Sequence, residues 1–380
     1  MFVKYLRNIM RGAVPAAALL WSTVTNADWT LNLREGVTPI SHEIYDLHML
    51  ILYIVTVIGI LVFGVMAWSI FHHRKSRGAV AANFHHSTAA EIAWTIIPIL
   101  ILVVIAVPAT KTLVFMEQTG DADITLKVTG YQWKWKYDYI EDDLSFFSSL
   151  DKKSNEARVL DSGIDPATVE NYLLEVDKPI VLPVDTKIRI LTTANDVIHA
   201  WWVPDLGWKR DAVPGYINDN WAIIEEEGTY RGQCAELCGK DHGFMPIVLK
   251  AVSKEAYRTW IADTKQAQID ELNNSDREWA KDELMTKGEE VYNAACAACH
   301  MANGQGIPGA FPALDGSALA TGPVADHMSI VLKGKAGSAM QAFGKQLSDA
   351  ELAAVITYER NAWTNAVGDI VQPADIKAAR

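Results

Sequence analysis

Cys234-Ala-Glu236-Leu-Cys238-Gly-Lys-Asp-His242-Gly-Phe-Met245 is the stretch that decides how this chain folds and what it holds. It places two thiols, an imidazole and a thioether close together in the sequence, and a second imidazole lies upstream in Asp196-Val-Ile-His199-Ala-Trp-Trp. Soft sulfur and imidazole together are a copper ligand set. The two thiolates can bridge two copper ions, each with one histidine, leaving Met245 and the Glu236 carbonyl as weaker outer ligands. The pattern predicts a dinuclear copper site.

Two other arrangements use the same residues. Cys234 and Cys238 can form a disulfide in an exported domain. Zinc can bind four of the side chains in a tetrahedral site, namely His199, Cys234, Cys238 and His242. Zinc has no use for Met245, however, and the C-x3-C spacing differs from the usual spacing of zinc cysteines. Copper is therefore the favoured metal.

The segment resembles the CuA site of cytochrome c oxidase subunit II. In that family the six matching positions are the copper ligands, and the glutamate binds through its backbone carbonyl: His199, Cys234, Glu236, Cys238, His242 and Met245. The resemblance also implies that the Glu236 side chain reaches a magnesium ion at the border with subunit I.

Composition sets the class of protein. The chain has 380 residues, half of them hydrophobic, and a net charge of −12. A few membrane spans joined to soluble domains explain this balance, and the length suits two or three domains. The acidic charge argues against a nucleic-acid partner and suits a cationic one. Residues 1–27 resemble a secretory signal peptide with cleavage after Ala27.

A membrane hairpin is expected over residues 28–115. The apolar run 47–71 and the run 92–110, interrupted by prolines, are each near the ~20 residues that a span needs. The loop between them contains His72-His73-Arg74-Lys75-Ser-Arg77. The positive-inside rule places this loop in the cytoplasm and the rest of the chain on the outer side.

Glu91 stands at the cytoplasmic start of the second span. An acidic residue at a helix N-terminus is commonly there to match the helix dipole. The resemblance offers a second interpretation, since the matching glutamate of subunit II lies at the mouth of a proton path into subunit I.

Residues 116–253 are expected to form a β domain. The segments 124–129 and 187–192 alternate with period two, and a short strand begins at Ala222. Such strands predict a sandwich or barrel, and the resemblance specifies a cupredoxin-type Greek-key barrel. Residues 141–172 are polar and acidic, and are interpreted as an insertion or surface loop.

An aromatic run, Gly130-Tyr131-Gln132-Trp133-Lys-Trp135-Lys-Tyr137-Asp-Tyr139, lies in this domain. On one strand its aromatic residues would share a face and form a core. In subunit II the residue matching Trp133 is where electrons enter the copper centre, so the resemblance implies that role for Trp133. An exposed indole near copper would suit it, and exposure is therefore expected.

The C-terminal part carries Cys296-Ala-Ala-Cys299-His300, the C-x-x-C-H motif of c-type haem attachment. The thiols would bond the porphyrin and His300 would bind the iron. Residues 254–281 are polar and helix-prone and are expected to form a linker helix. Residues 282–368, with an amphipathic helix before the motif and a last helix at 348–361, resemble a class I cytochrome c, followed by a tail at 369–380.

A second axial ligand is expected to be a methionine. Met301 adjoins the proximal histidine and cannot reach the opposite haem face. Met340 lies just before the last helix, where the cytochrome family carries this ligand, although Gln341 replaces the common proline. Met340 is therefore the predicted ligand, Met328 the alternative, and His327 is expected to be a surface residue.

The whole chain resembles subunit II of a caa3-like oxidase with a fused cytochrome c domain. The resemblance implies one covalent haem c, a CuA pair and a shared magnesium, with subunit I, subunit III and a cytochrome c donor as partners in a bacterial inner membrane. It implies an electron-relay subunit of a proton-pumping oxidase whose oxygen-reducing site lies in subunit I. Two alternatives remain at this stage: the electron-input subunit of a nitric oxide reductase, and a non-enzymatic membrane-anchored copper carrier.

Overall fold

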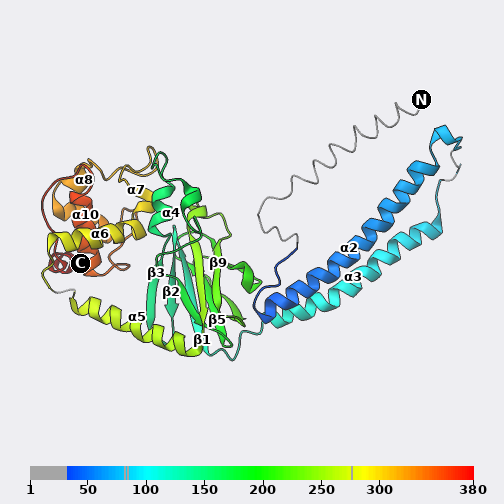
Figure 1. Ribbon diagram of the computed structural model, residues 1–380, viewed down its shortest axis with the longest axis horizontal. Helices are drawn as coiled ribbons and strands as arrows, with labels where there is room; N and C mark the ends of the chain where they lie inside the picture. Colours follow the sequence, from blue (N-terminus) through cyan, green and yellow to red (C-terminus); the bar gives the residue numbers. More distant parts are fainter. Residues whose placement is uncertain (1–31, 81–82, 84, 275–276) are drawn as a thin grey trace. The chain divides into compact units, whose positions relative to one another are not determined.

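The computed structural model describes residues 32–80, 83, 85–274 and 277–380, so the expected signal peptide lies outside the described residues. The chain first forms two long helices, α2 (Pro39–His72) and α3 (Thr88–Met116), that run side by side as a hairpin (Figure 1). A short 3-10 turn, η1 (Lys75–Arg77), lies in the connection. Within the described part of the chain, α2 and α3 are the helices long and apolar enough to cross a membrane.

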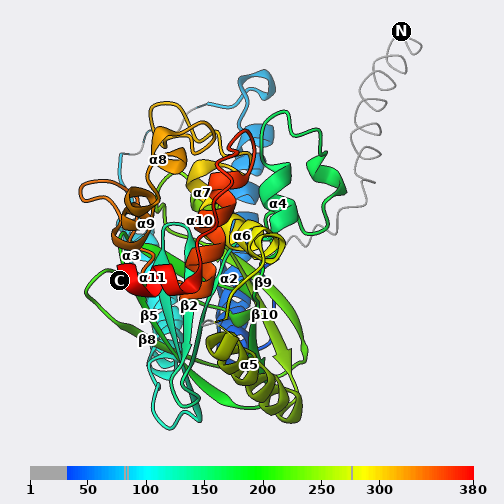
Figure 2. The ribbon, with the colours of Figure 1, turned by 90° about the vertical axis from the view of Figure 1, so that its left-hand side faces the viewer.

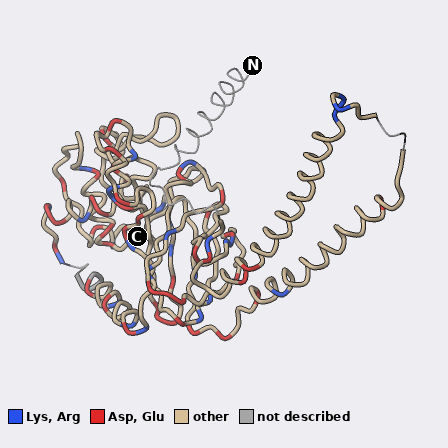
Figure 3. Tube along the Cα trace, turned by 45° about the vertical axis from the view of Figure 1, so that its right-hand side comes forward, with Lys and Arg blue, Asp and Glu red and all other residues tan. Residues whose placement is uncertain are grey.

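The hairpin is exposed and apolar, as a membrane-facing surface requires. Figure 3 shows that charged residues are almost absent from its middle and that basic residues gather at the connection. Pro98 and Pro108 lie inside α3 without ending it. At the other end, Thr38 caps α2 and donates its hydroxyl to Leu206 O at 2.9 Å, which ties the hairpin to the domain that follows. Gly207 lies so close to Ser41 that a Cβ there would be 2.5 Å from the Ser41 Cα.

Two five-stranded sheets make up the next domain. One has the order β3-β2-β1-β5-β8 and the other β4-β10-β9-β6-β7. Their bounds are β1 Ile124–Tyr131, β2 Lys134–Tyr139, β3 Leu144–Ser148, β4 Ile180–Pro183, β5 Lys187–Ala194, β6 His199–Trp202, β7 Lys209–Ala212, β8 Asn218–Ile223, β9 Gly228–Cys234 and β10 Pro246–Val252. Parallel pairing of β1 with β5 and of β4 with β10 joins strands far apart in sequence. Short 3-10 turns fall at η2 (Pro166–Thr168), η3 (Pro204–Leu206) and η4 (His242–Phe244).

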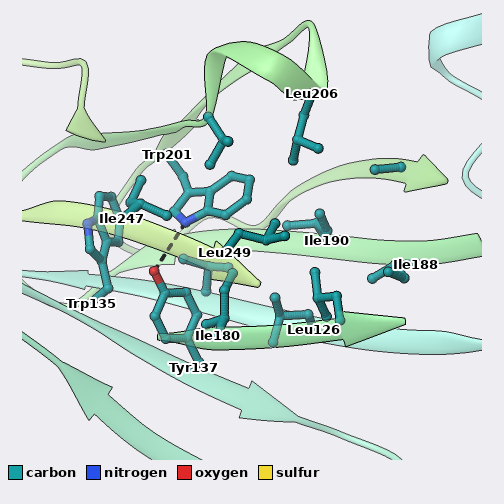
Figure 4. Packing of buried hydrophobic residues seen from close by; sticks show 14 of the residues in the cluster. Leu126, Trp135, Tyr137, Ile180, Ile188, Ile190, Trp201, Leu206, Ile247 and Leu249 are labelled. Atoms are coloured by element: carbon teal, nitrogen blue, oxygen red, sulfur yellow. Dashed lines mark hydrogen bonds between the residues drawn. The ribbon is translucent and has the colours of Figure 1, made fainter. Parts of the chain in front are cut away.

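The core of this domain lies between the two sheets (Figure 4). Period-two strands supply it: in β5, every second residue from Ile188 to Ala194 is buried. Trp201 from β6 lies across from Tyr137 of β2, and its indole Nε1 donates to the Tyr137 hydroxyl at 3.4 Å. Pairing this buried N–H with the hydroxyl avoids the cost of an unsatisfied polar group.

The aromatic run does not lie on one strand. β1 ends at Tyr131 and β2 begins at Lys134, so Gln132 and Trp133 form the turn of a hairpin, with a cis peptide bond between them. Trp135, Tyr137 and Tyr139 do share a buried face of β2. The expectation of a single aromatic strand was wrong because neither glycine nor proline marks the turn.

The polar segment 141–172 is more ordered than a surface loop. It contains β3, which pairs with β2, and the short helix α4 (Lys152–Ala157), which begins at the side-chain cap of Asp151. Three residues of α4 are buried: Ser154, Asn155 and Ala157. This segment therefore packs against other parts of the protein.

Helix α5 (Lys254–Asn274) follows β10 and packs on the sandwich through Tyr257 and Ile261, both 7% exposed. The C-terminal region is helical, with α6 (Lys281–Ala295), α7 (Ala297–His300), α8 (Ala318–Thr321), α9 (Val324–Lys333), α10 (Asp349–Asn361) and α11 (Pro373–Ala379). α6 and α10 pack closely against each other (Figure 2), and at their contact a Cβ on Gly288 would lie 2.2 Å from Ala354 O.

Helix α10 begins where the last helix was expected, since Ser348 and Glu351 form a capping box at its start, but it is not the last helix, because α11 follows it. Residues 369–380 contain α11, whose Ile376 is fully buried in the core of the helical region. His327 is not on the surface: it is 2% exposed, and its Nε2 lies 2.8 Å from Glu359 Oε2. A partner distant in sequence allows this imidazole to be buried, which is why its sequence neighbourhood did not reveal it.

Candidate metal centres

Strand pairing brings the distant histidine to the cysteine loop. His199 begins β6, Cys234 ends β9, and Trp201 pairs with Cys234 in the antiparallel register of these strands. Ala235 N donates to Ala200 O at 3.0 Å, and Cys234 N donates to Met245 O at 3.3 Å. The loop from Ala235 to Met245 therefore leaves β9 and returns to β10 at the same end of the sheet.

One half of the site surrounds the Cys234 sulfur. Cys234 Sγ lies 3.9 Å from His199 Nδ1 and 3.3 Å from Glu236 O. The two side chains are buried from water: His199 is 0% exposed and Cys234 3%. The Glu236 carbonyl therefore lies beside the Cys234 sulfur, and its role as a weak outer ligand stays a prediction.

The other half surrounds the Cys238 sulfur. Cys238 Sγ lies 3.6 Å from His242 Nδ1 and 3.5 Å from Met245 Sδ. His199, Cys234 and Cys238 offer ligand atoms within 4.8 Å of one another, a group that does not include His242. The two imidazoles therefore belong to opposite ends of the sulfur pair.

The sulfur pair distinguishes the possible chemistries. Cys234 Sγ and Cys238 Sγ are 3.8 Å apart and both cysteines are free, whereas a disulfide needs about 2.05 Å. Two sulfurs with an imidazole at each end and a thioether in contact match a bridged pair of soft metal ions. A single zinc ion would leave Met245 without a role. The donor set fits the dinuclear copper that the sequence predicted.

Asp196 orients the first of these imidazoles. Its Oδ1 lies 2.9 Å from His199 Nε2, so the ring turns Nδ1 toward the sulfur. Burial lowers the pKa of His199, but the hydrogen bonds to Asp196 and Cys234 outweigh it, and the net pKa is raised. A carboxylate behind a ligating histidine fixes the ring and increases its basicity as a ligand.

The two thiols ionise unequally. The pKa of Cys234 lies below its usual range because of its hydrogen bond with Cys238, with His199 adding to the effect. The pKa of Cys238 is raised by the same neighbour and by burial. Two negative sulfurs this close repel each other, and a bound cation relieves that repulsion by accepting electron density from both.

Trp133 joins this site to the helical region. Its Nε1 donates to Cys238 O at 3.3 Å, and the Gln132 amide donates to the same carbonyl at 2.9 Å. The indole meets the Phe311 ring edge-on, with centroids 6.1 Å apart. Trp133 is only 6% exposed, so the expectation of an exposed indole was wrong. Phe311, which lies beyond the C-x-x-C-H motif, is one of the groups that cover it.

The haem-attachment motif forms a single turn of helix. Cys299 N and His300 N both donate to Cys296 O, at 3.1 and 3.0 Å, which puts the two thiols and the imidazole on a compact turn. His300 Nδ1 donates to Pro312 O at 2.8 Å. This bond leaves Nε2 available for an iron ion, so these residues fit a c-type haem.

Both candidate axial methionines lie in the helical region. Met340 and Met328 both pack against the core of the helical region. Met301 directly follows His300, and its carbonyl accepts the Tyr292 hydroxyl at 2.7 Å. Met340 therefore stays a prediction, with Met328 as its alternative.

Two further residues keep the positions that the sequence gave them. Glu91 is exposed in the first turn of α3. Glu236 is half-buried within the copper loop. Their roles in a proton path and at a magnesium ion stay predictions.

Sequence reasoning missed several residues around the site. Asp196 stands three positions before His199, a spacing that could have revealed it. Lys134 is buried between Phe147 and Phe343, with its Nζ 4.5 and 4.9 Å from their centroids. Burial lowers the pKa of Lys134 to about 8. Because Phe343 belongs to the helical region, no local signal marks this contact.

Comparison with known proteins agrees with this geometry. The family model "Cytochrome C oxidase subunit II, periplasmic domain" matches residues 124–252, and the model of the transmembrane domain of the same subunit matches residues 26–112. The "Probable cytochrome c oxidase subunit 2" of Rickettsia prowazekii (strain Madrid E) is 42% identical over 253 residues, which are 64% of this chain and 78% of that protein. The chain belongs to the cytochrome c oxidase subunit II family.

Other comparisons extend this result. The subunit 2 of Arabidopsis thaliana is 38% identical over 253 residues, 64% of this chain and 94% of that protein. The crystal structure of the periplasmic domain of the Bradyrhizobium japonicum subunit II is 36% identical, with a TM-score of 0.35, and covers 40% of this chain and 99% of that one. A further model, "Cytochrome C oxidase, cbb3-type, subunit III", matches residues 283–358. This subunit II therefore combines a membrane-anchoring hairpin, a periplasmic domain and a C-terminal cytochrome c domain.

Proposed function

We propose that this chain is the electron-input subunit of a proton-pumping terminal oxidase. It takes electrons from a cytochrome c through its own haem domain and delivers them, by way of the copper centre, to haem a in subunit I. Subunits I and III are the expected partners. The hairpin would hold the chain in a bacterial inner membrane, with both redox domains on the periplasmic side.

One observation carries this proposal: the two candidate centres are connected by a short series of contacts. His300 donates to Pro312 O, and Phe311 is the preceding residue. Phe311 meets Trp133, and Trp133 donates to Cys238 O. Tightly packed groups between two redox centres are what an electron relay requires.

Haem c and a copper pair both supply reversible one-electron chemistry when bound. The residues of the chain supply position and exclusion of water. Cys296, Cys299 and His300 would hold the haem, with Met340 as the second axial ligand. Six residues would hold the copper: His199, Cys234, Glu236, Cys238, His242 and Met245.

Burial of the copper ligands has a physical benefit for the relay. A site enclosed in protein has little water to reorganise when its charge changes, and its ligands are already held by strand pairing. Two peripheral roles complete the proposal. Glu91 would stand at the mouth of a proton path, and the Glu236 carboxylate would bind magnesium shared with subunit I.

The direct test is Trp133→Phe in the assembled oxidase. We expect unchanged copper and haem content and an at least tenfold slower reduction of copper after rapid reduction of the haem. Trp260→Phe, in the aromatic contact between α5 and the sheet, is the matched control and should leave that rate unchanged. Equal rates in all three proteins would remove Trp133 from the relay.

A second test removes the cytochrome domain. A chain that ends at residue 281 should keep its copper but turn over more slowly at low donor concentration, because a tethered donor has an effective concentration that can reach about millimolar. Unchanged turnover would contradict the tethered relay. Zinc in place of copper, or a Cys234–Cys238 disulfide in the active oxidase, would overturn the copper assignment itself.

A further inference from the structure

Arg158 links the copper loop to the haem-attachment turn. It follows α4, in the polar segment 141–172, and its side chain is 6% exposed. Its Nη1 lies 2.9 Å from Asp241 Oδ2, and Asp241 immediately precedes the candidate copper ligand His242. Its Nη2 lies 3.4 Å from both Ala297 O and Ala298 O. These alanines are the two residues between the haem cysteines.

The guanidinium is held from every side. Nε donates to Asn155 Oδ1 at 2.7 Å, within the same segment. The charged group lies over the Phe244 ring at 4.5 Å, so it also packs on the copper loop. Arginine is suited to this position because its planar group presents several donors in a fixed geometry. A single rigid side chain therefore contacts the loops of both candidate centres.

Other contacts from α4 reach the same helical region. Asn155 Nδ2 donates to Asn293 O at 3.2 Å, near the end of α6. Lys152 Nζ lies 2.8 Å from Glu289 Oε1, with both side chains more than 40% exposed. Exposed pairs contribute little to stability, whereas a buried charge pair that loses one partner is costly. Arg158, with its partner Asp241 at 3% exposure, is therefore the contact that matters most.

We propose that Arg158 is a positioning residue that fastens the haem-attachment turn to the copper loop. The segment 141–172 is in this view a clamp that fixes the separation and orientation of the two centres. This inference rests on the proposed function for its electron-transfer consequence but not for the clamp itself. With both groups bound, ferrous haem would become ferric by losing one electron, and the copper pair would be reduced by gaining that electron.

Arg158→Lys tests the clamp in the full, cofactor-loaded chain. Lysine keeps the charge beside Asp241 but is a single point of donation and cannot also hold both alanine carbonyls. We expect hydrogen exchange of the amides of residues 296–300 and 241–245 to accelerate about tenfold, which is equivalent to about 1.4 kcal/mol. Copper content, haem content and both midpoint potentials should stay unchanged.

Lys152→Met is the matched control, because it removes the exposed contact between the same two parts. It should leave the amide hydrogen exchange of residues 296–300 and 241–245 unchanged. A residue that merely supports α4 would change exchange of residues 152–158 alone, so unchanged exchange in the two loops of Arg158→Lys would overturn the clamp. If that variant does not fold, the double variant Arg158→Met with Asp241→Asn leaves no unpaired buried charge and is judged by the same exchange.

Electron transfer gives the second readout. Rapid photoreduction of the haem should show copper reduction slowed at least tenfold in Arg158→Lys and unchanged in Lys152→Met. Slower copper reduction with unchanged midpoint potentials assigns the effect to the geometry of the two centres. An unchanged rate of copper reduction together with faster amide exchange in the two loops would refute the role of Arg158 in orientation. If the unmodified chain shows no haem-to-copper step, the proposed relay fails, and the exchange measurement alone decides the clamp.

Discussion

Gly130→Ala is expected to damage the copper centre without touching any ligand. Gly130 lies on β1, and a Cβ built there would be 2.7 Å from His199 Cδ2 and 2.8 Å from Cγ. Ordinary contacts begin near 3.4 Å, so the imidazole would have to move by about 0.7 Å. It has little room, because the ring is 0% exposed, packs against Trp135 and is held by Asp196.

The displacement exceeds the ~0.5 Å within which a functional site must be held. We expect copper affinity to fall by about 10- to 100-fold, as when a ligand loses its orienting support. The added methyl group should also lower the free energy of unfolding by about 1–3 kcal/mol. Copper affinity is measured by the copper retained per chain against a competing chelator, and the geometry of the site by electron paramagnetic resonance. Denaturant titration measures the free energy of unfolding.

Gly228→Ala is the matched control for this prediction. Gly228 also lies on a strand of the same domain, but its Cβ would meet only the outer end of the Tyr230 side chain, at 3.2 Å from the hydroxyl. That variant should keep its copper. A Gly130→Ala protein with full copper and an unaltered resonance spectrum would refute the close packing of His199 on β1.

Three further substitutions test the structure away from the copper ligands. Gly288→Ala should destabilise the cytochrome domain by about 1–3 kcal/mol, although alanine favours helix, because its Cβ would lie 2.2 Å from Ala354 O; denaturation followed by haem absorption measures this. Burial lowers the pKa of Lys134 to about 8 in the folded chain, whereas the unfolded lysine binds its proton more tightly, so folding is opposed at pH 7. Lys134→Met removes this penalty and should raise the free energy of unfolding at pH 7 by about 3 kcal/mol. That gain should shrink as pH rises from 8 toward 10.5, which urea titrations across this range would follow. Arg360→Met should lower the free energy of unfolding by about 1–3 kcal/mol, because it leaves the Ala320 and Gly322 carbonyls without their donor, whereas the exposed Asp369 is solvated by water; thermal unfolding measures it.

Each of these has a clear contradicting result. The Gly288→Ala protein should be less stable than the unmodified chain. Glu290→Ala, an exposed substitution on the same helix, is the control and should be more stable than Gly288→Ala. A rise in the stability of Gly288→Ala would contradict the α6–α10 contact. A Lys134→Met gain that is equal at pH 7 and pH 10 would show that the ammonium is not buried. An Arg360→Met protein of unchanged stability would mean that the arginine's hydrogen bonds contribute nothing.

The cluster of candidate copper ligands could be predicted because most of them lie close together in the sequence. Cys234, Cys238 and Met245 are near neighbours along the chain, and their donor chemistry favours copper. His199 needed only the pairing of two strands, β6 with β9, to reach them. The hairpin and the start of α10 were likewise marked by local signals, an apolar run and a capping box.

The missed features depend on contacts between distant segments. Trp133 is buried because Phe311 covers it, and His327 is buried because Glu359 accepts its hydrogen bond. Arg158 looked like one charge among many in a polar segment. The periodicity of a sequence does not reveal such pairings, since each forms only when segments far apart in the chain pack against each other.

The placement of His199 and Cys234 on paired strands, with the other candidate ligands on the loop that follows β9, bears on how the protein matures. Backbone pairing at Trp201 and Trp202 holds the two halves together before any ion arrives. Metal then binds to a site that is already formed, so little conformational entropy is lost on binding. The ion in turn acts as a crosslink across 35 residues of chain, so maturation should raise the melting temperature of this domain more than it changes its shape.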